Sequence, residues 1–131
     1  MDDKAAGAAP RAAGHYSPAI VHGGLVFVSG QLPIEPESGR RLTDEPIEAQ
    51  VVQVLHNLAA ILRANGSGLD QVLKVTVYVA DIALWERVNA VYAEFFGAHR
   101  PARAVVPTGP LHFGFLVELD AIASAQQPTN E

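Results

Sequence analysis

Apolar residues recur along this chain with the two periods that separate helices from strands. In residues 46–66, and again in residues 81–97, they return at three- and four-residue steps, the spacing of one face of a helix. Pro46 suits the first turn of the earlier helix and Gly66 its end, while Gly97 suits the end of the later one. We therefore predict two amphipathic helices. Their apolar stripes are Ile47, Val51, Val54, Leu55, Leu58, Ile61 and Leu62 in the first, and Trp85, Val88, Tyr92, Phe95 and Phe96 in the second.

Strands are predicted where apolar and polar residues alternate, or where a short apolar run lies between turn residues. Residues 19–34 contain two such segments joined at Gly23–Gly24, a pair that permits the positive φ of a tight hairpin turn. Residues 72–81, 102–106 and 115–123 predict three more strands. In the first of these, one face carries Leu73, Val75, Val77 and Val79, and the other Lys74, Thr76 and Tyr78. In the last, one face carries Phe115, Val117, Leu119 and Ala121, and the other Leu116, Glu118, Asp120 and Ile122.

The order of these elements is strand, strand, helix, strand, helix, strand, strand, which predicts an α/β fold with two helices packed on one face of a mixed sheet. The run "LVFV" at residues 25–28 is apolar on both faces. We therefore expect association with other chains to cover the opposite face of the sheet. Residues 1–14 and 126–131 lack apolar periodicity, so we expect a flexible arm and a flexible tail around a single domain of residues 15–125.

The composition agrees with one globular domain and excludes several classes of protein. Of the 131 residues, 49% are apolar and 18% are charged, which is too apolar for a disordered chain. The net charge of -5 argues against nucleic acid as a partner, because phosphate binding needs a basic surface. The absence of cysteine excludes disulfides, thiolate catalysis and cysteine-based zinc sites. The acidic start and the lack of an apolar stretch of about 20 residues predict a soluble, cytoplasmic protein.

Most of the common catalytic and cofactor motifs are missing from the sequence. The chain has no glycine-rich phosphate loop, and its five histidines never stand at the spacing of a metal-binding pair. We therefore expect no metal site and no cofactor. Ser29, in "VSGQ", has no neighbouring histidine or aspartate that would make it a nucleophile, which favours a role in a turn.

Two charged residues remain as candidates, because Arg103 and Glu118 each interrupt an apolar strand near the C-terminus. They could form a structural ion pair between adjacent strands, or both could point into solvent. They could also form a site. In a site, the guanidinium would bind a substrate carboxylate with two parallel hydrogen bonds, and the glutamate would orient and activate a water. The pattern alone leaves these alternatives open.

Taken together, several stretches of the chain resemble the Rid family, the reactive intermediate deaminases or YjgF-like proteins. The resemblance extends from about Tyr16 to Ala123. It rests on "YSPAI", "GGLVFVSGQLPIEPESG", "QVVQVLHNLAAILRANGSGLDQVLKVTVYVAD", "VNAVYAEFFG", "RPARAVV" and "VELDAIA". It implies a chorismate-mutase-like α/β fold and a homotrimer whose sheets line a central barrel, with ligand pockets in the clefts between subunits.

The resemblance also implies roles for individual residues. In the deaminase branch of the family, the arginine of the "PAR" motif holds the carboxylate of a 2-imino acid or its enamine, and Arg103 matches it. The glutamate that orients the attacking water matches Glu118. Further matches to pocket residues are Tyr16 of "YS", Ser29 and Gly30 of "SGQ", with residues 30–32 as the floor, and Asn89 of "VN". The implied reaction is hydrolysis of 2-iminopropanoate, 2-iminobutanoate and similar acids to 2-oxo acids and ammonia, without a cofactor.

The chain departs from the family directly after the arginine. Deaminases commonly have Arg-Ser-Cys there, whereas this chain has Arg103-Ala104-Val105. The resemblance thus places Val105 among the substrate-binding residues, in the position of the cysteine, and any contribution of the thiol is lost. Residues 107–115, "PTGPLHFGF", also differ and are expected to shape the pocket rim. His112 and Phe113 in this loop could touch the ligand, although a surface position is favoured for His112.

Two alternatives to a deaminase therefore stay open. The first is a trimeric carboxylate-binding sensor or chaperone-like protein with little catalysis, which the valine at position 105 suggests. The second is an endoribonuclease, an activity that has been attached to family relatives. The acidic net charge and the lack of a basic, aromatic-rich surface count against it here.

Overall fold

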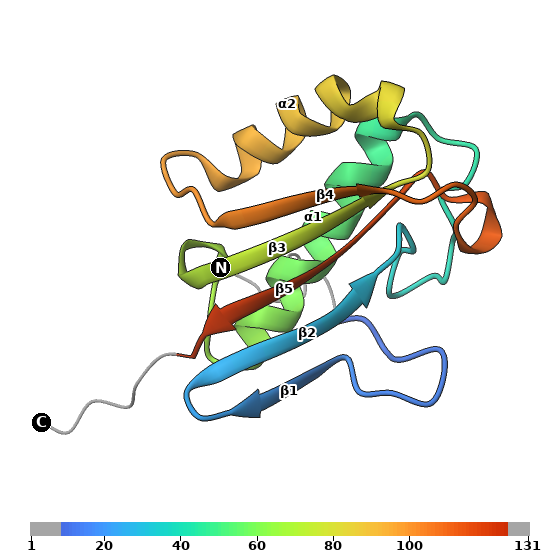
Figure 1. Ribbon diagram of the computed structural model, residues 1–131. Helices are drawn as coiled ribbons and strands as arrows, with labels where there is room; N and C mark the ends of the chain where they lie inside the picture. Colours follow the sequence, from blue (N-terminus) through green and yellow to red (C-terminus); the bar gives the residue numbers. More distant parts are fainter. Residues whose placement is uncertain (1–8, 126–131) are drawn as a thin grey trace, which may run out of the picture.

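The computed structural model describes residues 9–125, and in this range a five-stranded mixed sheet carries two helices on one of its faces (Figure 1). The strands are β1 (Ala19–His22), β2 (Leu25–Gln31), β3 (Val72–Val79), β4 (Ala102–Pro107) and β5 (Val117–Ser124). The helices are α1 (Ile47–Ala64) and α2 (Trp85–Phe96), with short 3-10 turns η1 (Leu69–Gln71), η2 (Ile82–Leu84) and η3 (His112–Gly114). The predicted fold class and order of elements are confirmed. The first eight residues of the expected arm, and the whole expected tail, lie outside the described residues.

The strands lie side by side in the order β1-β2-β5-β3-β4. The β3–β4 pair is parallel, and the other three pairs are antiparallel. The predicted hairpin joins β1 to β2, where Gly23 and Gly24 have positive φ angles of 59° and 78°. A parallel pair needs a crossover, which α2 supplies between β3 and β4. Because β5 enters between β2 and β3, the last strand of the chain lies at the centre of the sheet (Figure 1).

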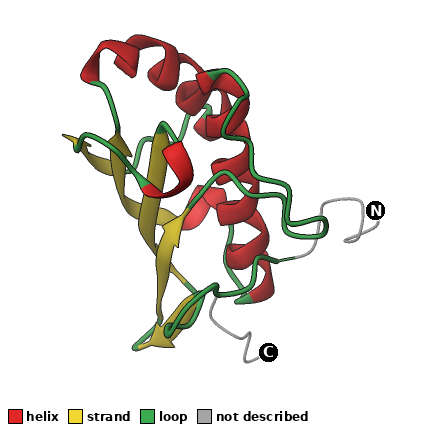
Figure 2. Ribbon diagram, turned by 90° about the vertical axis from the view of Figure 1, so that its right-hand side faces the viewer, coloured by secondary structure: helices red, strands yellow, loops and turns green. Residues whose placement is uncertain are grey.

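The core lies between the sheet and the two helices, because both helices cover the same face (Figure 2). Every second residue of β5, from Val117 to Ala123, is buried on this side, as the alternation predicted. The predicted stripe of α1 is buried along its whole length. In α2 the stripe is only partly covered: Val88, Tyr92 and Phe96 are buried, while Trp85 and Phe95 are partly exposed.

One prediction for β3 is wrong. Leu73 does not join the buried face of the strand; it is 48% exposed, whereas Val72 before it is fully buried. The cause is an irregularity in the pairing with β5, where Val72 pairs with Ala123 and Lys74 with Ile122. Leu73 is therefore an extra residue in β3, that is, a β-bulge. The bulge shifts the alternation of buried and exposed side chains by one residue, so that Val72, before the bulge, is buried in place of Leu73.

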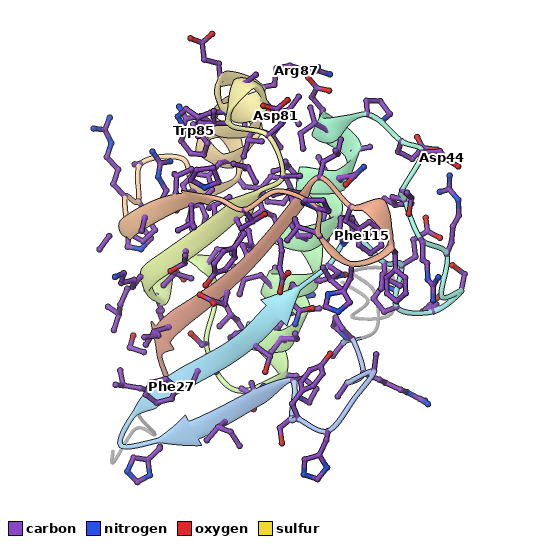
Figure 3. All side chains as sticks on the ribbon, turned by 45° about the vertical axis from the view of Figure 1, so that its right-hand side comes forward. Phe27, Asp44, Asp81, Trp85, Arg87 and Phe115 are labelled. Carbon is purple, nitrogen blue, oxygen red and sulfur yellow. The ribbon has the colours of Figure 1, made fainter. Side chains whose placement is uncertain are left out.

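No helix of residues 9–125 covers the opposite face of the sheet (Figure 2). Within this described range, the run at residues 25–28 is accordingly covered on one side only, since Val26 and Val28 are buried while Phe27 is 40% exposed (Figure 3). Ile20 of β1 and Val106 of β4 are exposed apolar residues of the same face. In the described part of the chain, no helix has the length and apolar character that crossing a membrane requires.

Two buried amides of α1 hold the segment of residues 32–45 against this helix. Gln50 donates hydrogen bonds to two backbone carbonyls of this segment and accepts one from the N–H of Leu116 at 2.9 Å. Asn57 donates to two further carbonyls of the same segment. Since a buried polar group that loses its partner keeps the cost of its desolvation, these bonds strongly favour one arrangement of the segment and of the approach to β5.

Candidate functional site

Arg103 lies on β4, on the face of the sheet that carries the helices, because it pairs with Val75, whose side chain is buried in the core. Its guanidinium rests against α2. Nη1 donates to Oδ1 of Asn89 at 2.8 Å, and Cζ lies 4.6 Å from the ring centroid of Trp85 and 4.9 Å from that of Tyr92. These contacts orient the guanidinium plane and leave most of its five N–H groups free to bind a ligand.

Among residues 9–125, no carboxylate lies within ion-pair distance of Arg103, so it forms no structural ion pair with Glu118 in the chain. Arg103 instead borders a cavity of about 490 Å³ between α2 and the start of β4, which we call the Arg103 cavity. The cavity is lined by Asn89, Tyr92, Ala93, Phe96, Gly97, His99, Arg100, Pro101 and Arg103. A guanidinium that is always charged and faces such a space is suited to bind a carboxylate.

Tyr92 contributes a buried hydroxyl close to Arg103. Its side chain is only 6% exposed, and Oη has no hydrogen-bond partner among the described residues. Burial raises the pKa of Tyr92, and the positive charge of Arg103 opposes this rise. The hydroxyl is therefore neutral near pH 7 and remains an unused hydrogen-bond donor beside the guanidinium.

Glu118 lies on β5, on the opposite face of the sheet, where it pairs with Tyr78. It is half-buried and borders a second cavity of about 460 Å³, which we call the Glu118 cavity. This cavity is lined by Ala13, Gly14, Tyr16, Ser29, Gly30, Leu32, His112, Phe113 and Glu118. Burial raises the pKa of Glu118; the nearby His112 opposes the rise and Asp120 adds to it. A carboxylate with a raised pKa is a stronger base, which suits the activation of a water.

Gly30 allows the carboxylate of Glu118 to lie against β2. A Cβ atom at this position would overlap Oε2 of Glu118, so a larger residue would displace the carboxylate. Ser29, the preceding residue, donates from Oγ to the carbonyl of Ser17 at 2.6 Å, which ties this part of β2 to the segment that carries Tyr16. The residues of "VSGQ" therefore act as a support for the Glu118 cavity. Ser29 lies within strand β2, so the predicted role in a turn is wrong.

The candidate site residues thus form two groups on opposite faces of the sheet. Arg103 and Asn89 lie with α2, near Trp85, whereas Tyr16, Ser29, Gly30 and Glu118 lie on the other side, toward the loop that carries Phe115 (Figure 3). Within one chain, the sheet itself separates Arg103 from Glu118. A single ligand therefore cannot reach Arg103 and Glu118 of the same chain around the sheet.

Val105 and His112 show what the departures from the family pattern do in the fold. Val105 borders neither cavity; it pairs with Val77 and packs against the core, so it supports the strand that carries Arg103. His112 is exposed, in agreement with the favoured surface position, and it also borders the Glu118 cavity.

Two parts of this arrangement were not predicted from the sequence. Trp85 and Tyr92 were assigned only to the core stripe of α2, although steps of four and three residues place them on one helix face with Asn89. That spacing was the available signal for an aromatic support of the guanidinium. Residues 13–14, at the end of the expected arm, line the Glu118 cavity, and nothing in their composition indicated it.

The chemistry available at the two cavities is that of a cationic fork and a basic carboxylate. Within residues 9–125, no three histidine, aspartate or glutamate side chains are grouped so that they could hold a metal ion. The arrangement can bind an anionic group at Arg103 and hold or deprotonate a water at Glu118.

Comparison with known proteins identifies the family. The sequence model of the family described as Endoribonuclease L-PSP matches residues 6–125. A RutC family protein of Pyrococcus horikoshii is 44% identical over 115 residues, which are 88% of this chain and 90% of that protein. The chloroplastic Reactive Intermediate Deaminase A of Arabidopsis thaliana is 40% identical over 116 residues, 88% of this chain and 62% of that protein. The crystal structure of RidA from an Antarctic Psychrobacter species is 36% identical, with a TM-score of 0.83 over 88% of this chain and 93% of that one. The chain therefore belongs to the Rid/YjgF family, the family described as Endoribonuclease L-PSP, as its motifs predicted.

Proposed function

We propose that this protein hydrolyses reactive 2-imino acids, or the enamines from which they form, to 2-oxo acids and ammonia in sites shared between subunits of a homotrimer. The observation that carries the proposal is the guanidinium of Arg103, which faces a cavity and has no acidic partner in residues 9–125. Glu118, half-buried in the second cavity, supplies the base. The name of the relative from Arabidopsis thaliana, Reactive Intermediate Deaminase A, supports the same class of reaction.

Two features support sites shared between subunits. The first is the separation of Arg103 and Glu118 by the sheet, so that each chain carries two halves of different sites. The second is the apolar surface of the uncovered sheet face, where Ile20 is 55% exposed and Phe27 40%. Such a surface is typical of a subunit interface. In a closed ring of three copies, the Arg103 cavity of each chain would meet the Glu118 cavity of the next. Every Arg103 and every Glu118 would then belong to a complete site.

In the proposed reaction, Arg103 binds the substrate carboxylate through two parallel hydrogen bonds and so places the C=N carbon beside the neighbouring copy's Glu118. Glu118 takes a proton from water as the water oxygen adds to this carbon, and it then gives the proton to the nitrogen. The tetrahedral intermediate carries a hydroxyl and an amino group on one carbon. Glu118 then moves the hydroxyl proton to this amino group, the C–N bond breaks, and ammonia leaves as the carbonyl of the 2-oxo acid forms. Water is the only co-reactant, so the reaction needs no cofactor.

The proposal is tested with imines formed in the reaction mixture. An amino-acid oxidase or a dehydratase generates 2-iminopropanoate or 2-iminobutanoate, and semicarbazide traps the imine that has not yet been hydrolysed. We expect the protein to lower the yield of semicarbazone and to speed release of the 2-oxo acid beyond the spontaneous rate in water. An unchanged semicarbazone yield over a wide range of protein concentration would contradict the deaminase.

The same assay separates the two other candidate functions. A carboxylate-binding protein with little catalysis would leave the semicarbazone unchanged but would still bind a 2-oxo acid through Arg103. The family description, Endoribonuclease L-PSP, raises RNA cleavage as a further activity. If RNA cleavage persisted in a Glu118→Gln variant, that activity would belong to another part of the surface, because it would not need Glu118. The net charge of -5 disfavours RNA binding by the chain as a whole.

A mixing experiment tests whether the sites are shared. Arg103→Ala and Glu118→Gln chains are each expected to be inactive alone. When the two are refolded or expressed together in equal amounts, we expect about a quarter of the wild-type activity, because each site draws its two halves independently from neighbouring chains. If both halves of each site came from one chain, mixing would restore nothing. Mixing Arg103→Ala with an Arg103→Ala, Glu118→Gln double variant is the matched control and should stay inactive.

A further inference from the structure

Phe113 has a backbone conformation that its residue type avoids. Its φ and ψ angles are 56° and 19°, in the left-handed region, and among residues 9–125 it is the only non-glycine residue with a positive φ. For a bulky side chain this conformation costs free energy that a glycine would not. Strained residues of this kind gather at ligand-binding sites, where the surrounding structure enforces them.

The neighbours of Phe113 hold both its backbone and its ring. Thr43 donates a hydrogen bond from Oγ1 to the Phe113 carbonyl at 3.0 Å. The guanidinium carbon of Arg41 lies 3.6 Å from the centroid of the Phe113 ring, and the ring of Phe115 packs against it edge-on at 5.8 Å. Thr43 and Arg41 belong to the segment of residues 32–45 that Gln50 fixes, so the position of the ring is built into the fold.

The ring of Phe113 is nevertheless 46% exposed, and it borders the Glu118 cavity. The aromatic ring of Tyr16 and the side chain of Leu32 line the same cavity. The hydroxyl of Ser29, a polar group in this wall, is already bonded to a backbone carbonyl. Glycine would adopt the backbone conformation of residue 113 without strain. The feature that phenylalanine adds at this position is therefore its exposed ring. It forms an apolar wall beside the candidate base.

We infer that Phe113 is the wall of a side-chain subsite, and that the protein prefers 2-imino and 2-oxo acids with branched or aromatic apolar side chains to those with a methyl group. The inference rests on the proposed function and names its substrate class. The reacting carbon of a 2-imino acid carries a carboxylate, a nitrogen and a side chain. With the carboxylate on Arg103 of one copy and the attacking water on Glu118 of the next, the side chain lies toward Tyr16, Leu32 and Phe113.

The test replaces Phe113 by residues that accept its backbone conformation. Phe113→Gly removes the ring and the strain, while Phe113→Asn keeps a side chain and tolerates a positive φ, so both variants are expected to fold. Binding of pyruvate, 4-methyl-2-oxopentanoate and phenylpyruvate is measured by calorimetry. Hydrolysis is measured as kcat/KM for the imines formed from alanine, leucine and phenylalanine. Phe95→Leu, which removes a ring that packs on His56 and borders neither cavity, is the matched control.

We expect the wild type to favour the leucine- and phenylalanine-derived acids over the alanine-derived acid by about tenfold in both measurements. Both Phe113 variants should lose most of this preference, by a comparable amount, through weaker binding and slower hydrolysis of the leucine- and phenylalanine-derived acids. Phe95→Leu should keep the wild-type preference. No preference in the wild type, or the full preference in both Phe113 variants, would overturn the inference.

The two readouts separate this inference from the proposed function. If no imine is hydrolysed faster than in water, but the binding preference is present and depends on Phe113, the subsite stands and the deaminase fails. If imines are hydrolysed and the Phe113 variants keep the wild-type ratio, the deaminase stands and the subsite fails. If the wild-type protein bound none of the three 2-oxo acids and hydrolysed no imine, both the deaminase and the subsite would be contradicted.

Discussion

The Arg103→Ala variant is expected to lose measurable binding of 2-oxo acids, with affinity falling by about a hundredfold or more, because the substrate carboxylate would lose a charged and bidentate partner. The loss should appear in calorimetric titration with pyruvate and 4-methyl-2-oxopentanoate. Imine hydrolysis should fall to the spontaneous rate, since nothing else would hold the C=N carbon near Glu118. Unchanged affinity in this variant would refute the assignment of Arg103 as the carboxylate ligand.

Two controls make this result specific. Arg103→Lys keeps the positive charge but not the planar fork that rests on Trp85 and Tyr92, so it should recover only a small part of the affinity. Arg100→Ala removes a second cation from the same cavity and should change affinity by less than about threefold, since long-range attraction between exposed charges is weak. Thermal unfolding of each variant checks that the fold is retained.

Much of the fold could be predicted because the apolar residues of most elements recur with the period of the helix or strand that they form. In β5, apolar residues at every second position matched the buried face, and Gly23–Gly24 matched the hairpin that joins β1 to β2. Leu73 was placed wrongly because a bulge is a feature of pairing between strands, and the pattern of a single strand does not contain it. The exposure of Phe27 also depends on how the elements pack, since no helix of residues 9–125 lies on that face of the sheet.

The site was predictable in its residue types but less so in its geometry. Arg103 and Glu118 stood out because each interrupts an apolar strand, and each borders a cavity. That they lie on opposite faces depends on the register of β3 with both of its neighbours, where Val75 pairs with Arg103 and Tyr78 with Glu118. Register follows from turns, bulges and packing between segments far apart in sequence, so it could not be read from either strand alone.

The Glu118→Gln variant is expected to lower kcat for imine hydrolysis by about 100- to 10,000-fold, the usual contribution of a positioned general base. Glutamine has nearly the shape of glutamate, so it fits beside Gly30 without displacing β2. Because Arg103, the proposed partner of the substrate carboxylate, borders the other cavity, affinity for 2-oxo acids should stay within about threefold of the wild type. A variant that loses binding and catalysis together would show that Glu118 supports the pocket rather than acting on water.

The raised pKa of Glu118 predicts how both the reaction rate and the thermal stability depend on pH. Burial raises the pKa of Glu118, so the wild-type rate should decline on acidification at a pH above the ordinary range of glutamate, and this decline should be absent from the residual rate of Glu118→Gln. The folded state binds this proton more tightly than the unfolded state, so the glutamate favours folding only when protonated, and this benefit is lost as the pH rises through the raised pKa. Thermal unfolding at pH 7 should therefore show the glutamine variant to be at least as stable as the wild type, with the difference shrinking as the pH is lowered. A glutamine variant that is less stable at pH 7 would indicate that an ionic partner compensates the charge of Glu118, and such a partner would weaken its role as a base.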